Sequence, residues 1–190
     1  MNRALVSACA ALAAAPLARP ALAQLDFTPF AVEVRAGTAI PRGRLDELDA
    51  GVFGVSVGGD LTYHLAPFLG VYAGYSWTRF EGEAGLGEYR DTGLDLGVRL
   101  GVPTPLIPID PWIRAGAVLH RFESVGTDDV DFESDAEWGY EVGAGIGLGF
   151  LPKFTLTPQA SYVRYRVGTG GENELEVEYI KVGIGLRLRL

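Results

Sequence analysis

Cysteine is almost absent from this chain. Cys9 is the only cysteine among 190 residues, and it lies in a leading segment that we expect to be removed on export. The mature protein would therefore contain no disulfide and no thiol chemistry. Export without disulfides is compatible with a protein of the cell envelope, although it does not require one.

The chain also lacks a long apolar run and an excess of positive charge. No apolar run of 18 residues follows the leading segment, so the sequence predicts no membrane-spanning helix. Removing that segment takes away two arginines, Arg3 and Arg19, and no acid, so the net charge goes from −8 to −10, with 14 basic and 24 acidic residues. Such a charge argues against nucleic acid as a partner.

The composition excludes two further classes of protein. The chain is 48% hydrophobic and 11% aromatic, which is too apolar for a disordered protein. It contains 26 glycines, more than an ordinary helical protein tolerates. If such a chain enters a membrane without a spanning helix, it must do so as a closed barrel, because an open sheet edge cannot lie in hydrocarbon.

Residues 1–23 have the features of a secretory signal. Arg3 provides the charged start, Ala4–Leu17 is apolar, and Ala21–Ala23 is an A-x-A cleavage site that would leave Gln24 as the mature N-terminus. Prolines interrupt the apolar run, which is shorter than the ~20 residues of a spanning helix. A lipoprotein signal ending at Cys9 is a competing reading, but cleavage there would leave a very short hydrophobic segment. We therefore expect a signal at 1–23 and a barrel domain at 24–190.

The stretch Asp91–Val102 alternates between two kinds of side chain, which in a strand lie on opposite faces. The even positions are mainly aliphatic: Thr92, Leu94, Leu96, Val98, Leu100 and Val102. The odd positions are glycine or charged: Asp91, Gly93, Asp95, Gly97, Arg99 and Gly101. A half-buried strand of a soluble protein could alternate similarly, but here the polar face has almost no volume. That favours the narrow lumen of a small barrel whose aliphatic face meets lipid.

Seven other stretches alternate in the same way. The eight predicted strands are Phe30–Ile40, Val52–Leu65, Leu69–Phe80, Asp91–Val102, Trp112–Phe122, Trp138–Phe150, Phe154–Arg166 and Glu176–Leu190. Short connections that contain proline alternate with longer polar ones, which is typical of bacterial outer-membrane barrels with short periplasmic turns and longer extracellular loops. Pro158 falls inside a strand and lacks a backbone donor, so we expect a bulge or a position that does not donate there.

These features together resemble the small eight-stranded outer-membrane barrels of the opacity-protein and OmpX-like superfamily. The resemblance covers about Phe27–Leu190 and implies an all-β fold, an eight-stranded antiparallel up-and-down transmembrane barrel in the cell outer membrane. Members of that superfamily usually end on an aromatic residue that the assembly machinery reads. This chain departs from the pattern, because Leu190 is its last residue and Tyr179 is the nearest aromatic one.

The alternation also predicts which charged side chains face the lumen. The predicted lumen ion network comprises Glu33, Arg35, Asp60, Asp95, Arg99, Arg114, Glu141, Lys181 and Arg187, with Asp91 and Arg189 also inward by position. A selective pore is one interpretation. We favour a network of ion pairs that fills a lumen just wide enough for side chains. At the seam between the first and last strands, we expect Glu33 to pair with Arg187, or otherwise with Arg99 or Arg114.

Three other groups of residues are candidates for a function. The aromatic residues Phe53, Tyr75, Trp77, Trp138, Tyr140 and Tyr162 are interpreted as a girdle at the membrane interface. The acidic series Asp128, Asp129, Asp131, Glu133, Asp135 and Glu137 could offer oxygen ligands to Ca²⁺, but its spacing matches no known loop, and we favour a solvated extension of the strands. His120 and Ser124 could suggest a lipid hydrolase, although no motif supports one.

The sequence therefore predicts a non-enzymatic barrel without a metal or cofactor. Its expected role is structural, or surface interaction through the extracellular loops. The alternatives are a small passive channel, a lipid-modifying enzyme, and a soluble ligand-binding barrel with the two faces exchanged. The expected partners are outer-membrane lipid and lipopolysaccharide, the assembly machinery and an extracellular ligand.

Overall fold

The computed structural model describes residues 29–43, 45, 53–81, 88–102, 104, 109–125, 130–168 and 174–190. The expected signal at 1–23 and the start of the barrel domain at residue 24 lie outside these residues, so both stay predictions. Among the described residues, no helix has the length and apolar character needed to cross a membrane.

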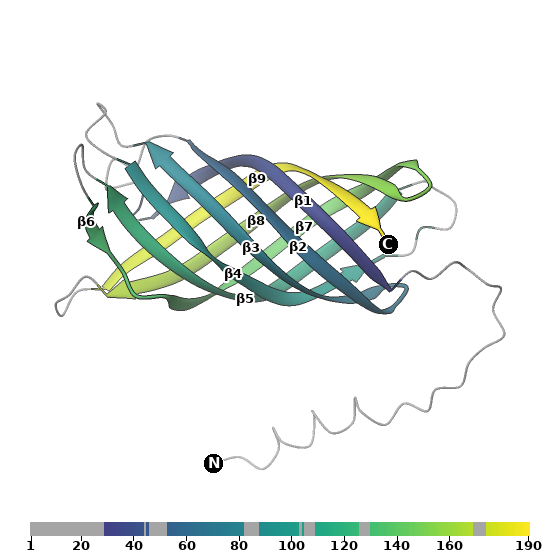
Figure 1. Cartoon of the computed structure of the whole chain (residues 1–190), viewed down its shortest axis with the longest axis horizontal. Helices are drawn as coiled ribbons and strands as arrows, with labels where there is room; N and C mark the ends of the chain where they lie inside the picture. The colour runs from purple at the N-terminus through teal and green to yellow at the C-terminus, as the bar shows by residue number, and fades with distance from the viewer. Residues whose placement is uncertain are drawn as a thin grey trace, which may run out of the picture.

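The described part of the chain is almost entirely β-strand. Its nine strands are β1 (Phe30–Arg42), β2 (Gly54–Ala66), β3 (Leu69–Glu81), β4 (Glu88–Gly101), β5 (Ile109–Val125), β6 (Val130–Glu133), β7 (Glu137–Leu151), β8 (Phe154–Gly168) and β9 (Glu174–Arg189). All pairings are antiparallel, and eight of these strands form one barrel in the order β4-β3-β2-β1-β9-β8-β7-β5. The remaining strand, β6, pairs with β5 alone at one end of the barrel (Figure 1). The predicted fold class is confirmed.

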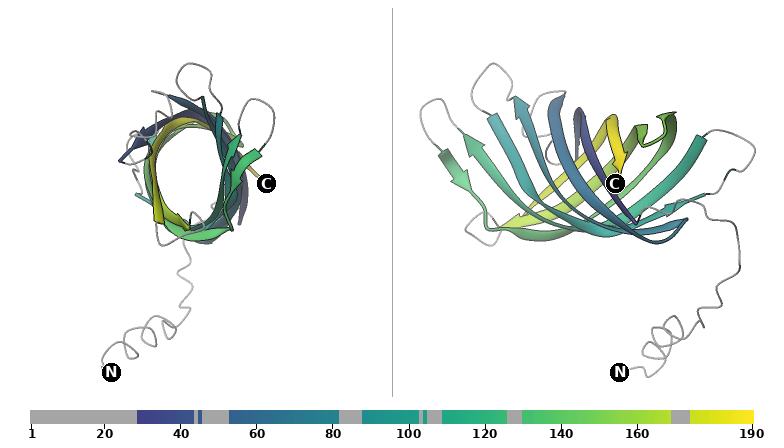
Figure 2. Two further views of the ribbon diagram at one scale, coloured as in Figure 1. Left: turned by 90° about the vertical axis from the view of Figure 1, so that its left-hand side faces the viewer. Right: turned by 45° about the vertical axis from the view of Figure 1, so that its right-hand side comes forward.

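Two seams close the wall, so that the barrel has no free edge. The first and last strands pair from Ala31 opposite Arg189 to Arg42 opposite Glu178. β4 pairs with β5 along fourteen residue pairs, from Glu88 opposite Val125 to Gly101 opposite Trp112. The view along the barrel shows the wall as a continuous ring (Figure 2). Full closure gives every strand in the wall a hydrogen-bonded neighbour on both sides, as hydrocarbon requires.

The predicted assignment of inner and outer faces is also confirmed. On β4, Leu94, Leu96 and Val98 point outward and are 49%, 44% and 41% exposed, whereas the neighbouring Asp91 and Asp95 are buried inside. The same alternation holds on the other strands of the wall. The soluble barrel with its faces exchanged is therefore wrong, because the bulky aliphatic side chains lie outside the ring.

The structure corrects two of the expected strand limits. β5 begins at Ile109 and includes Pro111, which lies opposite Ile146 of β7, where the sequence suggested a proline-rich connection. The expected long loop at 123–137 is partly strand as well, because β5 continues to Val125 and β6 folds back onto it. Both differences arise because a strand can pair beyond the point where its alternation is clear in sequence.

Pro158 is accommodated without a bulge. The register between β7 and β8 is the same on both sides of it, with Gly145 opposite Gln159 and Leu148 opposite Leu156, but the two intervening pairs are absent from the ladder. On the other side, Pro158 lies opposite Ile184 of β9 in continuous register. Two alternatives were expected at Pro158, a bulge or a position that does not donate a backbone hydrogen bond. The structure shows the second.

The two ends of the barrel have different connections. One end carries the start of β1, the end of β9 and the two-residue turns at 67–68 and 152–153. The other carries the connections at 43–53, 82–87 and 169–173, together with β6 (Figure 1). The connection at 102–108 is longer than those at 82–87 and 169–173, so the expected contrast in length is absent there.

Candidate functional site

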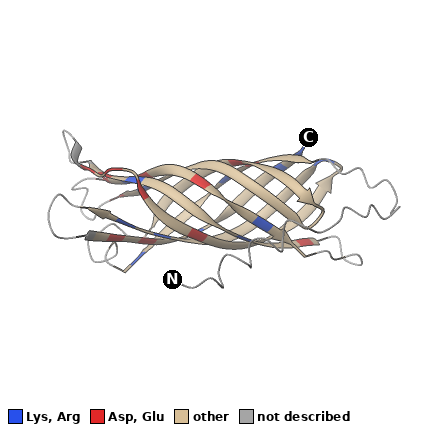
Figure 3. Ribbon diagram, turned by 90° about the horizontal axis from the view of Figure 1, so that it is seen from below, with Lys and Arg blue, Asp and Glu red and all other residues tan. Residues whose placement is uncertain are grey.

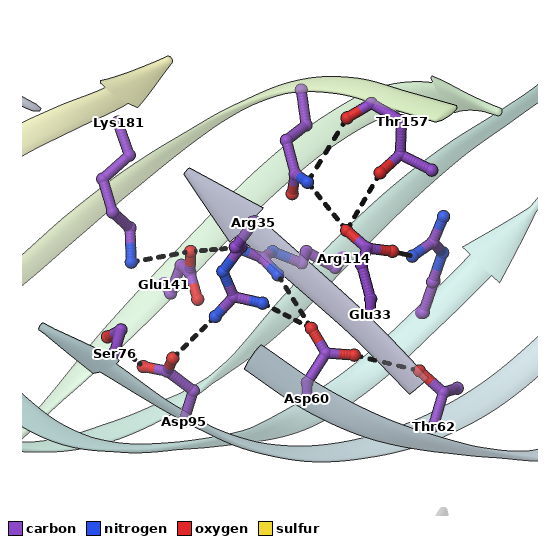
Figure 4. A network of polar contacts seen from close by, with 12 residues as sticks. Glu33, Arg35, Asp60, Thr62, Ser76, Asp95, Arg114, Glu141, Thr157 and Lys181 are labelled. Carbon is purple, nitrogen blue, oxygen red and sulfur yellow. Dashed lines mark hydrogen bonds and ion pairs between the residues drawn. The ribbon is translucent and has the colours of Figure 1, made fainter. Parts of the chain in front are cut away.

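The middle of the lumen is crossed by ion pairs between side chains of distant strands. Arg35 of β1 contacts two carboxylates, Asp60 of β2 and, at 2.8 Å from Nη2 to Oδ2, Asp95 of β4 (Figure 4). All three side chains are at least nine-tenths buried. Because β1 and β4 are not neighbours in the wall, the Arg35–Asp95 contact spans the lumen instead of running along one surface.

Glu141 of β7 joins the opposite side of the barrel to this network. Arg114 Nη2 of β5 lies 2.5 Å from Glu141 Oε1, and Arg114 Nη1 lies 3.9 Å from Asp60 Oδ2. Lys181 Nζ of β9 lies 3.4 Å from the same Glu141 oxygen. Figure 4 shows these side chains converging from the wall toward the middle of the lumen. Buried charges in such a network offset one another's desolvation cost, which is large for an unpaired ion.

Glu33 has a different basic partner from the one that we expected first. Arg187 lies opposite Glu33 in the register of the seam, but the Glu33 carboxylate accepts from Arg99 Nη1 at 2.8 Å and from Thr157 and Gln159 at 3.1 and 2.7 Å. Arg187 Nη2 instead lies 2.9 Å from His64 Nε2. The prediction that Glu33 pairs with Arg187 was therefore wrong. Arg99, the next candidate named, is the ion-pair partner of Glu33. Shear in the barrel moves the Arg99 side chain across the lumen to Glu33.

His120 lies between two carboxylates of β4. Its Nδ1 is 2.6 Å from Asp91 Oδ1 and its Nε2 is 3.0 Å from Asp95 Oδ1, and Tyr165 donates to the other Asp91 oxygen at 2.6 Å. Of the two ring nitrogens only Nε2 is in hydrogen-bonding geometry, with Asp95, whereas Nδ1 contacts Asp91 without a hydrogen bond. The hydrogen bonds of His120 do not include Ser124. The described geometry therefore offers no base for a serine nucleophile there.

The end of the lumen beneath the longer connections is filled by apolar side chains. This outer apolar cluster consists of Ala39, Leu45, Phe80, Val118, Phe122, Val163, Tyr165, Val167, Val177 and Tyr179, all at most 2% exposed. Within it, the rings of Phe80 and Tyr179 pack edge to face at 5.6 Å. The cluster was not predicted from the sequence, although Phe80 and Phe122 continue the inward positions of their strands. The strands are longer than the length needed to cross the lipid, and the extra length adds this apolar layer to the lumen beyond the central ion pairs.

The six predicted girdle aromatics all lie on the outer face of the barrel. Phe53, Tyr75, Trp138 and Tyr140 are 62%, 54%, 64% and 44% exposed, and Trp77 and Tyr162 are partly exposed. They lie toward the end that carries the longer connections. Their role at a membrane interface stays a prediction.

A second set of outward aromatics, which the sequence analysis did not single out, lies toward the other end. It consists of Phe30, Tyr63, Phe68, Phe150 and Phe154. On β7, ten residues separate Tyr140 from Phe150. They cover about 33 Å along a strand, and a tilt of roughly 40° reduces this to about 25 Å along the barrel axis, the height of the apolar band in outer-membrane barrels.

Paired charges lie on the outer wall beyond the first set of aromatics. Arg79 Nη2 lies 2.6 Å from Glu88 Oε2, and Arg164 Nε lies 2.8 Å from Glu176 Oε1. Hydrogen bonds from Arg164 lower the pKa of the partly exposed Glu176 carboxyl below its usual value. Charged positions are dense toward this end of the barrel and sparse along the middle of the wall (Figure 3). This distribution fits an apolar band followed by a charged, water-facing rim.

The acidic series is only partly within the described residues. Asp128 and Asp129 lie outside them, and the side chain of Asp131 is not described. Glu133 pairs with Arg121, and β6 pairs with the extended end of β5. The interpretation of the acidic series as a solvated extension stays a prediction. In the part of the chain that the structure describes, no group of three or more His, Cys, Asp or Glu side chains is arranged to hold a metal ion.

A comparison with protein families assigns the fold to a known group. The model of the outer membrane protein beta-barrel domain matches residues 7–187, which is nearly the whole chain. The chain belongs to this family. The family and the outward aliphatic faces together place this chain in the cell outer membrane.

Solved structures of similar barrels support the same architecture. Neisserial surface protein A is 19% identical, with a TM-score of 0.68, and the match covers 85% of this chain and 97% of that one. A major outer membrane protein from Thermus thermophilus is 16% identical with a TM-score of 0.52, covering 85% and 99%. Ail, the attachment invasion locus protein of Yersinia pestis, is 14% identical with a TM-score of 0.51, covering 84% and 97%. At these identities the likeness shows the fold alone. No curated protein matches the sequence.

Proposed function

We propose that this outer membrane protein beta-barrel domain is a closed, non-enzymatic barrel whose role is structural, or surface interaction through its extracellular end. The observation that carries the proposal is the filled lumen. The central ion pairs join strands on opposite sides of the barrel, and the outer apolar cluster occupies the lumen above them. A lumen filled in two layers leaves little room for a water column, which the alternative of a passive channel requires.

The extracellular end is the part of the molecule left for interaction with partners. We assign that end to the longer connections and β6, because outer-membrane barrels place their short turns in the periplasm. Two barrels of similar fold carry names that refer to the cell surface or to attachment, Neisserial surface protein A and Ail. Their names motivate a surface role for this chain. Lipopolysaccharide would meet the paired charges of the outer wall, and a ligand would bind to the connections beyond them.

A conductance measurement tests the closed lumen. The folded barrel, inserted at single-molecule density into a planar lipid bilayer in 1 M salt, is expected to give no current steps above baseline. A porin with an open lumen, inserted by the same procedure, serves as the control for insertion. Reproducible ion-conducting steps from this barrel would replace the proposal with the passive channel. A conductance seen only after the outer apolar cluster is truncated, for example with Phe80→Ala and Phe122→Ala, would support it.

A second measurement tests the surface role. Cells that display the full barrel are compared with cells that display a barrel lacking 128–133, at equal amounts of folded protein in the outer membrane. A surface-interaction role predicts that the deletion changes attachment of the cells to surfaces or to other cells. Equal attachment by the two kinds of cell would contradict an interaction role for this segment and would favour the structural role.

A further inference from the structure

Arg187 differs from the other buried arginines of the lumen in its partner. Within the described part of the chain, Arg35, Arg99 and Arg114 each contact a carboxylate. Arg187 instead contacts the imidazole of His64, with 2.9 Å between its Nη2 and His64 Nε2, and it is only 8% exposed. A guanidinium ion can donate hydrogen bonds but cannot accept them. His64 Nε2 is therefore the acceptor and carries no proton.

The other ring nitrogen of His64 faces a second acceptor. Nδ1 lies 3.3 Å from the carbonyl oxygen of Pro29, which also accepts from the His64 backbone N–H at 2.6 Å. The neutral ring therefore carries its proton on Nδ1 and donates it to Pro29. In this form the side chain joins three segments, the residue before β1, the end of β2 and the end of β9. These segments meet at the end of the barrel where the seam between β1 and β9 begins.

A protonated His64 ring cannot keep the contact with Arg187. Protonation would place a second donor against the guanidinium, so repulsion between two cations would replace the hydrogen bond. The charged groups that act most strongly on the ring are all cations: Arg187 and Arg189 of β9 and Arg99 of β4. The carboxylates that act most strongly on Arg187 are already paired with other arginines: Glu33, Asp60 and Asp110. The surroundings of the ring therefore favour its neutral form.

We propose that His64 is an acid-sensitive latch at the start of the barrel seam. The neutral ring holds Arg187 to the residue that precedes β1, and protonation of the ring in mild acid releases Arg187. An unperturbed histidine protonates near pH ~6.5 and a carboxylate near pH ~4, so acidification reaches the latch before the carboxylates of the lumen. The unfolded chain binds this proton more readily than the folded barrel does. The stability that the latch contributes is therefore complete at neutral pH and is lost as the pH falls.

Nitrogen-15 NMR of the folded barrel in micelles tests the state of the ring. The chain contains only two histidines, and the His64 ring can be assigned through its sequence neighbours Tyr63 and Leu65. At pH ~7.5, Nδ1 is expected to carry a proton and Nε2 to carry none, and the Nε2 proton should appear as the pH is lowered. A ring that carries its proton on Nε2 at neutral pH, or that is already charged there, would overturn the proposal, because neither form can accept from Arg187.

Thermal unfolding of the micelle-solubilised barrel at pH ~7.5 and pH ~5 tests whether the latch contributes to stability. His64→Gln is the matched variant, because glutamine can accept from Arg187 and donate to Pro29 but does not titrate. If the folded ring resists protonation by about one pH unit, acidification should lower the wild-type midpoint by roughly 3–5 °C more than that of His64→Gln. Arg187→Gln should also lose less than the wild type, because the protonated ring then meets no cation at Nε2. Lys153→Gln, which removes an exposed cation from a turn at the same end, should lose as much as the wild type.

The outcomes of this series separate the latch from a general effect of acid. Equal losses in the wild type and in His64→Gln would overturn the proposal, because acid would then act through other groups. A full wild-type loss in Arg187→Gln would overturn it too, because this arginine would then not oppose protonation of the ring. If His64→Gln does not fold, the comparison of the wild type with Arg187→Gln and the position of the ring proton in the wild-type barrel still decide the question.

Discussion

At the scale of single residues, the arrangement of the lumen depends on which side chain each buried charged group pairs with. Glu33 illustrates this, because its cross-strand neighbour Arg187 and its ion-pair partner Arg99 are different residues. A long guanidinium side chain can reach over several strands, and Arg99 also lies 3.8 Å above the ring of Trp112. Packing against an aromatic ring restricts the rotamers of Arg99 and directs its charge toward Glu33.

A double-mutant cycle measures this selection. Glu33→Gln and Arg99→Gln are each expected to lower the free energy of unfolding by about 3–5 kcal/mol, because each leaves a buried charge without its partner. The double variant should lose much less than the sum of the two. The matched cycle with Arg187→Gln in place of Arg99→Gln should be close to additive. Stronger coupling of Glu33 to Arg187 than to Arg99 would contradict the described contacts. Folding titrations in lipid vesicles provide the free energies.

At the scale of strands, the outer face of β4 provides the clearest test of lipid contact. Leu96 is 44% exposed, and its neighbours in register are Ala73 and Ala117, so no large side chain covers it. Leu96→Arg is expected to destabilise the barrel by ~2–4 kcal/mol, the cost of a cation near the bilayer midplane. The control is Thr92→Arg, on the same face but opposite Trp77, where a cost of ~0–1 kcal/mol is expected. Equal costs in vesicle folding titrations would mean that depth in the membrane does not distinguish the two positions.

For the extension formed by β5 and β6 we expect the opposite result, a change that leaves the barrel folded. Deleting 128–133 should leave the barrel folded and its migration on gels heat-modifiable, because β6 lies outside the closed wall. The deletion must stop before Ser134, whose buried hydroxyl accepts from the Phe122 backbone N–H at 2.9 Å. Ser134→Ala is expected to cost about 1 kcal/mol by itself. Loss of heat-modifiable migration in the 128–133 deletion would show that the extension is part of the folded core.

At the scale of the whole molecule, the sequence predicted the barrel but not its interior contacts. Alternation with a period of two residues determines which side chains face inward, so the outward position of Leu96 and the inward position of Asp95 follow from their neighbours. The Glu33–Arg99 contact does not follow, because it depends on barrel shear, which alternation leaves undetermined. The outer apolar cluster was missed because Phe80 and Phe122 lie at strand ends, where the polar lumen pattern gives way to large side chains.

The central claim is that the lumen is filled, and single-cysteine labelling tests it most directly. The mature chain is expected to contain no cysteine, since Cys9 is the only one in the sequence. Ser161→Cys places a thiol inside the barrel at a position 7% exposed, and Gly168→Cys places one at the exposed outer end of β8. In the folded barrel, a charged, membrane-impermeant thiol reagent is expected to label Gly168→Cys and to leave Ser161→Cys unmodified, whereas both should react after unfolding. Labelling of Ser161→Cys in the folded barrel at the rate of Gly168→Cys would contradict the account.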